Sequence, residues 1–383
     1  MTTKRISREN IDSRIAVANN LLKKHNLSCD IFDSYLTEDM IKGNIENFIG
    51  AIAIPLGLCG PINIHGQYAE GEFIVPMATE EGTVVATYSR GAKIINESGG
   101  CETLVYDDYF LRAVQFRTAS LKKSAELIKW CKSHESEISI LINKSGNFVR
   151  LLEMSYDCLG TTVIVTIKLH TSDAMGSNMS SEASQVLSDY VSENSRLVES
   201  VVLPYPEDKK FIPSRQKGKK VIARVVLRRE PYTRITRTSL EALEELTKNY
   251  KDLLASHGCY SLNMHAANGM AAMFQALGQD MAYLGECSQV IVSSHFVDAD
   301  HLEFSVTLPT LIIGTVGAAT GLHACKTALS IMDCYGAGKA KKLAEIIASV
   351  VLAGEISCAS AQCAFEFVQA HETMGKNYPM HKE

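Results

Sequence analysis

The feature that most constrains this chain is the stretch at residues 70–93, EGEFIVPMATEEGTVVATYSRGAK. An apolar run at residues 73–75 predicts a strand, and Pro76 is expected to end it because proline has no N–H for a sheet ladder. Thr79 is expected to cap the helix that follows, since threonine suits a helix N-terminus. The stretch therefore predicts a strand, a tight turn and a helix in direct succession.

The turn in this stretch carries two adjacent acids, Glu80 and Glu81. Neighbouring acids beside an apolar run form a good site for a carboxyl that stays partly protonated, as a proton donor must. The alternative interpretation is a capped helix start with two solvated acids, which also favour a helix N-terminus. The local pattern leaves both interpretations open.

Composition excludes several classes of protein. The chain has 383 residues, of which 46% are hydrophobic and 21% charged, with a net charge of -5. These values are typical of a globular protein of two or three domains and give no reason to expect nucleic acid as a partner. The first twenty residues lack the apolar core of a signal peptide, and the longest apolar runs are too short to span a bilayer. The eleven cysteines are scattered, so we expect reduced thiols, no metal site, no membrane association and a cytoplasmic location.

A compact unit is predicted at residues 113–203. Its clearest strand is 161–170, where alternate apolar residues share one face and polar residues the other. The predicted order is strand, helix, strand, strand, helix, strand, which is the split βαβ arrangement. The expected fold is therefore α+β, with three parts: an N-terminal helical arm at 1–43, a large domain at 44–112 and 204–383, and the inserted unit at 113–203.

Two glycine-containing segments are candidates for binding a dinucleotide. The sequence DAMGSNM at residues 173–179 leads into the second helix of the inserted unit. Small residues at a helix start leave its first N–H groups open to an anion such as pyrophosphate, although an ordinary capped helix start is the alternative. A glycine-rich turn at residues 313–322 suits close approach of backbone.

Three other segments carry isolated charged groups. A proline-punctuated basic loop contains Asp208, Lys209 and Lys210, for which a solvated charge run is the default interpretation. Asp280 is expected in the apolar second half of a helix at residues 265–285, either on the solvent face or retained for a function. A long helix of small residues is predicted at 341–371.

Taken together, these stretches resemble the 3-hydroxy-3-methylglutaryl-CoA (HMG-CoA) reductase family, and the resemblance covers most of residues 44–371. Nine segments occur in family order, and the placement of DKK after the inserted unit is similar to the class I branch. They are ENFIG at 46–50, IPLGLCGP at 54–61, VPMATEEG at 75–82, SRGAK at 89–93, DAMGSNM at 173–179, DKK at 208–210, HAAN at 265–268, GQD at 278–280 and IGTVG at 313–317. The fold implied is a large domain around a central helix and sheet, with an inserted ferredoxin-like cofactor domain.

The resemblance implies a catalytic role for four residues. Glu81 would donate a proton during carbonyl reduction, and Lys209 would stabilise the developing oxyanion. Asp280 would hydrogen-bond to both of them and tune them. His371, at the end of the last long helix, would protonate the departing CoA thiolate.

The resemblance also implies ligands and a partner. NADPH is the expected cofactor, with NADH as the alternative, and CoA is part of the substrate. A homodimer or a dimer of dimers is expected, because the family builds its site between two subunits. The implied substrate-binding residues are Arg112, Asp208, Lys210, Lys251 and Asn268, and the implied cofactor-binding residues are Asp173, Met175, Gly176, Asn178, Asn147, Gly314 and Gly317.

The chain departs from the family pattern in the regions that bind the acyl and cofactor groups. Only Arg112 survives from the family's DGMTRGP segment, and Val202 stands where class I members have a serine that binds the substrate carboxylate. Asn147 stands where they use an arginine near the cofactor phosphate. Two alternatives therefore remain at the sequence level: a diverged reductase of another acyl-CoA thioester, and a catalytically silent homologue that binds CoA or a nucleotide.

Overall fold

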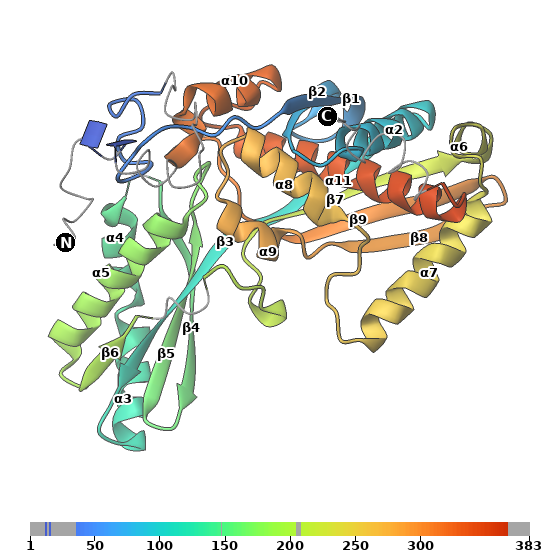
Figure 1. The fold of residues 1–383 in the computed structure, drawn as a ribbon. Coiled ribbons are helices and arrows are strands. Elements are labelled where there is room, and N and C mark those ends of the chain that lie inside the picture. Colours follow the sequence, from blue (N-terminus) through green and yellow to red (C-terminus); the bar gives the residue numbers. More distant parts are fainter. Residues whose placement is uncertain (1–11, 14, 17–35, 147, 204–207, 367–383) are drawn as a thin grey trace.

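A computed structural model describes residues 12–13, 15–16, 36–146, 148–203 and 208–366. The described chain is a mixed α+β fold in which one long strand, β3 (Cys101–Arg117), belongs to both a larger and a smaller group of strands (Figure 1). Its first half pairs with β7 (Gly218–Arg228) and its second half with β5 (Thr162–His170). The two parts of the molecule are therefore joined by a continuous strand.

The larger group of strands has the order β2-β1-β3-β7-β9-β8. Alternate residues of β7 and β9 are buried, and the helices α2, α8 and α11 lie along one side of this sheet (Figure 1). The remaining elements of this part are β1 (Leu56–His65), β2 (Glu70–Ala78), β8 (Ile291–Asp298), β9 (His301–Leu311), α2 (Val84–Glu97), α6 (Arg229–Thr236), α7 (Leu240–Ser256), α8 (Ala266–Ala276), α9 (Leu284–Cys287), α10 (His323–Ile331) and α11 (Ala340–Cys363).

The expected end of the first strand at Pro76 is wrong. Strand β2 continues to Ala78, and Pro76 pairs with Leu58. Within the described chain, strand β2 is an edge strand that pairs only with β1. The described sheet therefore has no second neighbouring strand to which an N–H at position 76 would have to bond. The expected cap at Thr79 is also wrong: its hydroxyl accepts the Glu81 N–H at 3.1 Å within the turn, and α2 begins only at Val84.

The long C-terminal helix is shorter than predicted. Helix α11 ends at Cys363 in a Schellman motif, because Phe365 has a φ of 56° and the Glu366 N–H reaches the Ala361 carbonyl at 3.0 Å. The predicted helix is therefore wrong at residues 364–366, and its remaining residues, including His371, lie outside the described residues. By length and composition α11 could cross a membrane, but its apolar segment is entirely buried in the fold.

Small residues allow α11 to pass through the core. The Cα of Gly91 on α2 lies so near the α11 backbone that an added Cβ would be 1.8 Å from the Ala353 carbonyl oxygen. Tyr88 fills the adjacent space between Gly354 of α11 and Gly269 of α8. The glycines allow α2, α8 and α11 to pack closely together, and the tyrosine ring fills the space between them.

Two buried glutamates of α11 bind backbone amides of neighbouring segments. Glu345 accepts the N–H groups of Tyr68 and Ala69 at 2.9 and 2.7 Å. Glu355 accepts those of Met264 and His265 at 2.8 and 3.0 Å, just before α8. These bonds fix the β1–β2 turn and the start of α8 on the central helix.

Replacing Glu345 with glutamine is expected to remove one loss of stability that occurs as the pH rises. Burial raises the pKa of Glu345 above its ordinary 4.5. The folded protein therefore binds this proton more tightly than the unfolded chain, and stability falls as pH rises from 4.5 through the raised value. A glutamine carbonyl can accept the same two N–H groups without a titration. The Tm at about pH 4 minus the Tm at about pH 8 should be smaller in Glu345→Gln than in the original protein, and an equal signed difference would contradict this assignment.

The smaller part has its own apolar core and agrees largely with the predicted unit. Val163, Val165, Ile167 and Leu169 of β5 are fully buried on one face, as predicted. The observed order contains one helix more than predicted, because α4 (Glu135–Ser145) follows α3 without a strand between them. The other elements are α3 (Leu121–Ser133), β4 (Arg150–Leu159), α5 (Ser177–Ser195) and β6 (Ser200–Val202).

The helix predicted at residues 265–285 is interrupted. Helix α8 ends at Ala276, and Gly278 adopts a φ of 65° that an α-helix does not allow. Asp280 consequently lies outside α8, where its carboxylate caps a short 3₁₀ turn by accepting the Ala282 N–H at 2.9 Å. The predicted position of Asp280 within a helix is therefore wrong.

Candidate active site

The start of α5 opens onto a cavity of about 610 Å³, which we call the helix-start pocket. Gly176 precedes the helix with a φ of 98°, and no side chain caps the first turn. The N–H groups at this end are therefore available to an anion, as the sequence predicted. The pocket is lined by Gly43, Asn44, Ala174, Met175, Gly176, Ser177, Asn178, Met179, Lys209, Gly278, Gln279, Asp280, Met281, Tyr283, Val316, Gly317, Ala318 and Ala319.

The two glycine-containing segments predicted to hold a dinucleotide lie against each other. A Cβ on Gly314 would meet the Met175 nitrogen at 2.8 Å, and the Thr315 N–H donates to the Asp173 carbonyl at 2.8 Å. Buried Gln279 fixes the second of these segments to the GQD segment, because its amide both donates to and accepts from the Gly314 backbone, at 3.0 and 2.9 Å. Sequence reasoning did not single out Gln279, although it stands in the GQD segment.

Asp173 does not line this pocket. Its carboxylate accepts the N–H groups of Gly338 and Ala340 at 2.8 and 3.0 Å and so caps the start of α11. Burial alone would raise the pKa of Asp173, but these backbone hydrogen bonds hold it below its usual value. The aspartate therefore fixes the DAMG segment to the central helix.

Lys209 and Asp280 form an ion pair at the edge of the helix-start pocket. The Lys209 Nζ lies 3.1 Å from Asp280 Oδ2, and the two side chains are 44% and 35% exposed. Lys209 has a φ of 59°, in the left-handed region that non-glycine residues rarely occupy. An exposed pair contributes little to stability, so the unusual backbone of Lys209 must be maintained by other contacts.

Arg112 forms an ion pair with Asp208, the residue directly before Lys209. The Arg112 guanidinium, 2% exposed, makes two contacts of 2.8 Å with the Asp208 carboxylate and donates to the Ser180 hydroxyl at 2.9 Å. Burial raises the pKa of Asp208, but the Arg112 hydrogen bonds and charge outweigh it and lower the pKa. Both residues were expected to bind substrate, and here they bind each other.

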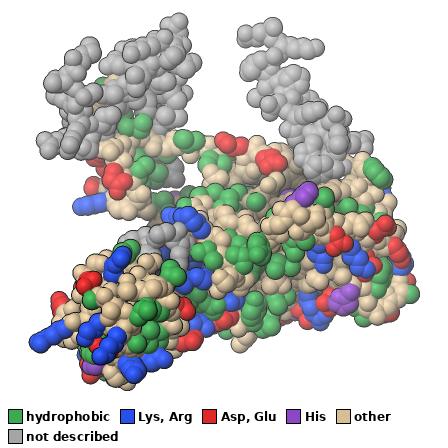
Figure 2. Space-filling view, turned by 90° about the horizontal axis from the view of Figure 1, so that it is seen from below, with side chains coloured by type: hydrophobic (Ala, Val, Ile, Leu, Met, Phe, Trp, Pro, Cys, Tyr) green, Lys and Arg blue, Asp and Glu red, His purple; other side chains and the backbone are tan. Residues whose placement is uncertain are grey.

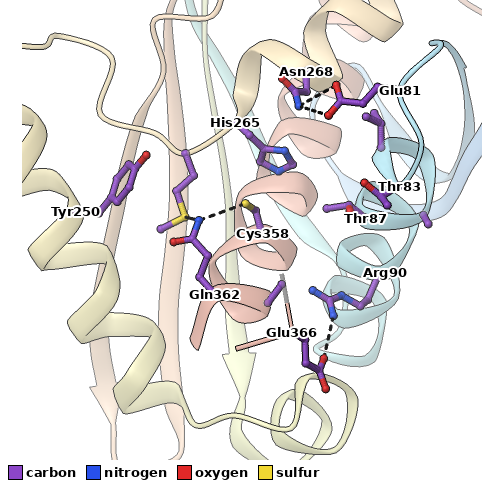
Figure 3. A pocket seen from close by; sticks show the side chains of 14 residues that line it. Glu81, Thr83, Thr87, Arg90, Tyr250, His265, Asn268, Cys358, Gln362 and Glu366 are labelled. Atoms are coloured by element: carbon purple, nitrogen blue, oxygen red, sulfur yellow. Dashed lines mark hydrogen bonds and ion pairs between the residues drawn. The ribbon is translucent and has the colours of Figure 1, made fainter. Parts of the chain in front are cut away.

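A second cavity of about 450 Å³, the central-helix pocket, lies between α2, α8 and α11 (Figure 3). Asn268 of α8 donates to both oxygens of Glu81 at 3.5 and 3.4 Å, and Glu81 is exposed in this single chain. Arg90 is anchored to the Ser357 carbonyl at 2.6 Å. The pocket is lined by Glu81, Thr83, Val84, Ala86, Thr87, Arg90, Tyr250, Met264, His265, Asn268, Cys358, Ala361, Gln362 and Glu366.

The three described residues that were predicted to be catalytic lie in two different pockets. Glu81 lines the central-helix pocket, whereas Lys209 and Asp280 line the helix-start pocket, and the two pockets share no lining residue. The expected contact of Asp280 with Lys209 is present. No hydrogen bond or ion pair between described residues joins Glu81 to Asp280 in the single chain.

Other candidate residues lie outside both pockets. Lys251 is on α7 beside a small cavity, and Lys210 is exposed. Val202 is 56% exposed on β6. Asn147 is outside the described residues, as is His371.

The family of the chain follows from comparison with known proteins. Residues 10–376 match the family model of hydroxymethylglutaryl-coenzyme A reductase. The HMG-CoA reductase of Pyrococcus abyssi is 35% identical over 353 residues, which cover 88% of this chain and 86% of the relative. That of Methanocaldococcus jannaschii is 35% identical over 356 residues, which cover 89% of this chain and 87% of the relative. The chain belongs to the HMG-CoA reductase family.

A solved structure has the same fold. The class II HMG-CoA reductase from Streptococcus pneumoniae, bound to NADPH in open conformations, has a TM-score of 0.70 and 19% identity. The similarity covers 94% of this chain and all of the other. The family matches favour a reductase of HMG-CoA. They do not favour the two alternatives, a reductase of another acyl-CoA thioester and a catalytically silent homologue.

Proposed function

We propose that this chain reduces HMG-CoA to mevalonate and free CoA with two molecules of NADPH and two protons. Family membership over residues 10–376 supports the reaction. The observation that carries the proposal is the Lys209–Asp280 pair, which stands at 3.1 Å beside the open start of α5. Hydride addition to a carbonyl places negative charge on its oxygen, which a fixed cation stabilises. The open helix start beside that cation suits the phosphates of the cofactor.

The helix-start pocket fits a dinucleotide. Two of its walls are the backbone segments 174–179 and 316–319. Gly317 has a φ of 79° with nothing within 4 Å of an added Cβ, so this edge is open to a ligand. Met175, Gly176, Asn178 and Gly317 would hold the cofactor, while Gly314 permits the close packing of the two segments. When bound, the nicotinamide supplies the hydrides. NADPH rather than NADH is proposed from the family.

Lys209 would stabilise the negative charge that each reduction places on the substrate oxygen. A single preorganised donor at such an oxygen contributes about 3 kcal/mol to the barrier reduction. Asp280 accepts the Ala282 N–H as well as the lysine contact, so its carboxylate is fixed by the backbone and orients the ammonium. This arrangement directs the Lys209 side chain at the helix-start pocket.

Glu81 would supply the protons, and His371 would protonate the CoA thiolate. Asn268, which donates to Glu81, would orient that carboxyl and the acyl group. A proton donor needs a carboxyl that water does not fully solvate, and Glu81 is exposed in the single chain. A neighbouring subunit that covers Glu81 would provide that environment.

We propose a homodimer, or a dimer of dimers, whose active sites join the helix-start pocket of one chain to the central-helix pocket of another. The open face of the large sheet supports this proposal, because Leu104, Tyr106 and Ile291 there are 51%, 48% and 39% exposed. Figure 2 shows hydrophobic side chains gathered near the middle of the side seen from below. An apolar surface of this kind favours association.

The proposed domain division follows the expected boundaries. Residues 113–203 would form a ferredoxin-like NAD(P)-binding domain inserted between residues 44–112 and 204–383, which would form the substrate domain. The separate apolar core of the small part supports this division. We further propose a cytoplasmic enzyme of isoprenoid biosynthesis with the class I arrangement of its DKK loop.

The direct test is oxidation of NADPH by purified protein. HMG-CoA should be consumed with two NADPH oxidised per thioester, and mevalonate should appear in equal amount to the free CoA. A panel with NADH and with acyl-CoA thioesters lacking the free carboxylate serves as the control. Absence of NADPH and NADH oxidation with HMG-CoA would refute the proposal.

A further inference from the structure

Side chains of the segment at residues 280–286 together contact all three residues of the 208–210 loop. Its three contacting side chains, Asp280, Tyr283 and Glu286, are spaced by three residues across a 3₁₀ turn (Met281–Tyr283) that runs into α9. In a 3₁₀ helix, residues three apart lie on the same side. The segment therefore presents these groups to one neighbouring strand of chain.

Tyr283 holds two residues of that loop. Its hydroxyl donates to the Asp208 carboxylate at 3.1 Å, and its ring centroid lies 5.4 Å from the Lys209 Nζ. The side chain is fully buried, and burial raises the pKa of its phenol, so the hydroxyl remains a donor. Arg112 also holds this aspartate, with a contact of 2.8 Å.

Glu286 holds the other end of the loop. Its carboxylate, on a residue 1% exposed, interacts with the Lys210 backbone amide. It also lies 3.2 Å from the ammonium of Lys217, immediately before β7. Buried groups therefore connect both neighbours of Lys209, Asp208 and Lys210, to the large sheet.

The backbone of Lys209 explains what these contacts do. A φ of 59° costs free energy for a lysine and persists only where the surroundings determine it. Lys209 itself is 44% exposed and cannot supply that constraint, whereas Tyr283 and Glu286 are buried and fix its two neighbours.

We infer that Tyr283 and Glu286 are positioning residues that hold the 208–210 loop so that the Lys209 ammonium faces the helix-start pocket. This inference rests on the proposed function for its catalytic consequence. The structural part, a loop ordered by two side chains, stands independently of turnover. It assigns roles to residues outside the segments that identified the family.

The test compares Tyr283→Phe with Tyr232→Phe. Each variant loses one buried hydroxyl, but the Tyr232 hydroxyl bonds to Ser360 at 2.8 Å, away from the loop. We expect kcat to fall about tenfold in Tyr283→Phe, with the KM for NADPH changed less than about twofold, and to be unchanged in Tyr232→Phe. Glu286→Ala, which removes the acceptor of the Lys210 backbone amide, should resemble Tyr283→Phe. Equal kcat in Tyr283→Phe and Tyr232→Phe would overturn the inference.

Amide hydrogen exchange of residues 208–210 separates this inference from the proposed function. Exchange should be faster in Tyr283→Phe and Glu286→Ala than in the original protein, and unchanged in Tyr232→Phe. Inactive original protein with this exchange pattern would refute the reductase proposal and retain the positioning role. Unchanged exchange at 208–210 in Tyr283→Phe would refute the positioning role whatever the activity.

Discussion

Replacing Lys209 with alanine is expected to lower kcat by about 10²- to 10³-fold, the usual cost of removing one oxyanion donor. The reason is local: Lys209 is the lysine beside Asp280 in the lining of the helix-start pocket, and alanine leaves the substrate oxygen without its cation. Steady-state NADPH oxidation with HMG-CoA measures the effect, and binding of NADPH measured by fluorescence should persist.

The control for this substitution is Lys123→Ala. Lys123 is also an exposed lysine paired with a carboxylate, Glu126, at 2.7 Å, but it lies on α3 of the small part. Its removal should leave kcat within about twofold, since exposed pairs contribute little. If Lys209→Ala retained the kcat of Lys123→Ala, Lys209 would have no role in the chemical step.

Gly91→Ala is expected to destabilise the fold by more than about 4 kcal/mol, beyond the range of ordinary substitutions. The added Cβ would lie 1.8 Å from the Ala353 carbonyl oxygen and 2.4 Å from its carbon. Both are backbone atoms in the middle of α11, so no side-chain rotation relieves the clash, and α2 must move away from the central helix. Urea unfolding followed by circular dichroism measures the loss.

Gly321→Ala is the matched substitution. An added Cβ there meets nothing within 4 Å, and the residue has no positive φ. Its urea midpoint should lie close to that of the original protein. Coincident midpoints for Gly91→Ala and Gly321→Ala would show that the contact between α2 and α11 is not as close as described.

Periodicity predicted the elements whose environment is uniform along their length. The alternation in β5 identified its buried face. Elements whose course depends on distant neighbours were less predictable. Pro76 is accommodated because β2 is an edge strand, and the sequence of β2 does not contain that information.

The site was predictable where family segments carry it. The DAMG and GTVG segments pack together, and Lys209 meets Asp280, as the resemblance implied. The contacts of Tyr283 and Glu286 were not predictable, because they join residues about seventy positions apart without any shared pattern. Nor did the sequence indicate that Arg112 binds Asp208.

We propose that one active site combines Lys209 of one subunit with Glu81 of another. Lys209→Ala and Glu81→Gln, each nearly inactive alone, should be co-expressed with different tags and the mixed dimer isolated. One of its two sites would then carry both substitutions and the other neither, so we predict about half of the original activity per dimer. A mixed dimer no more active than the separate variants would contradict the claim, because each site would then draw both residues from the same chain.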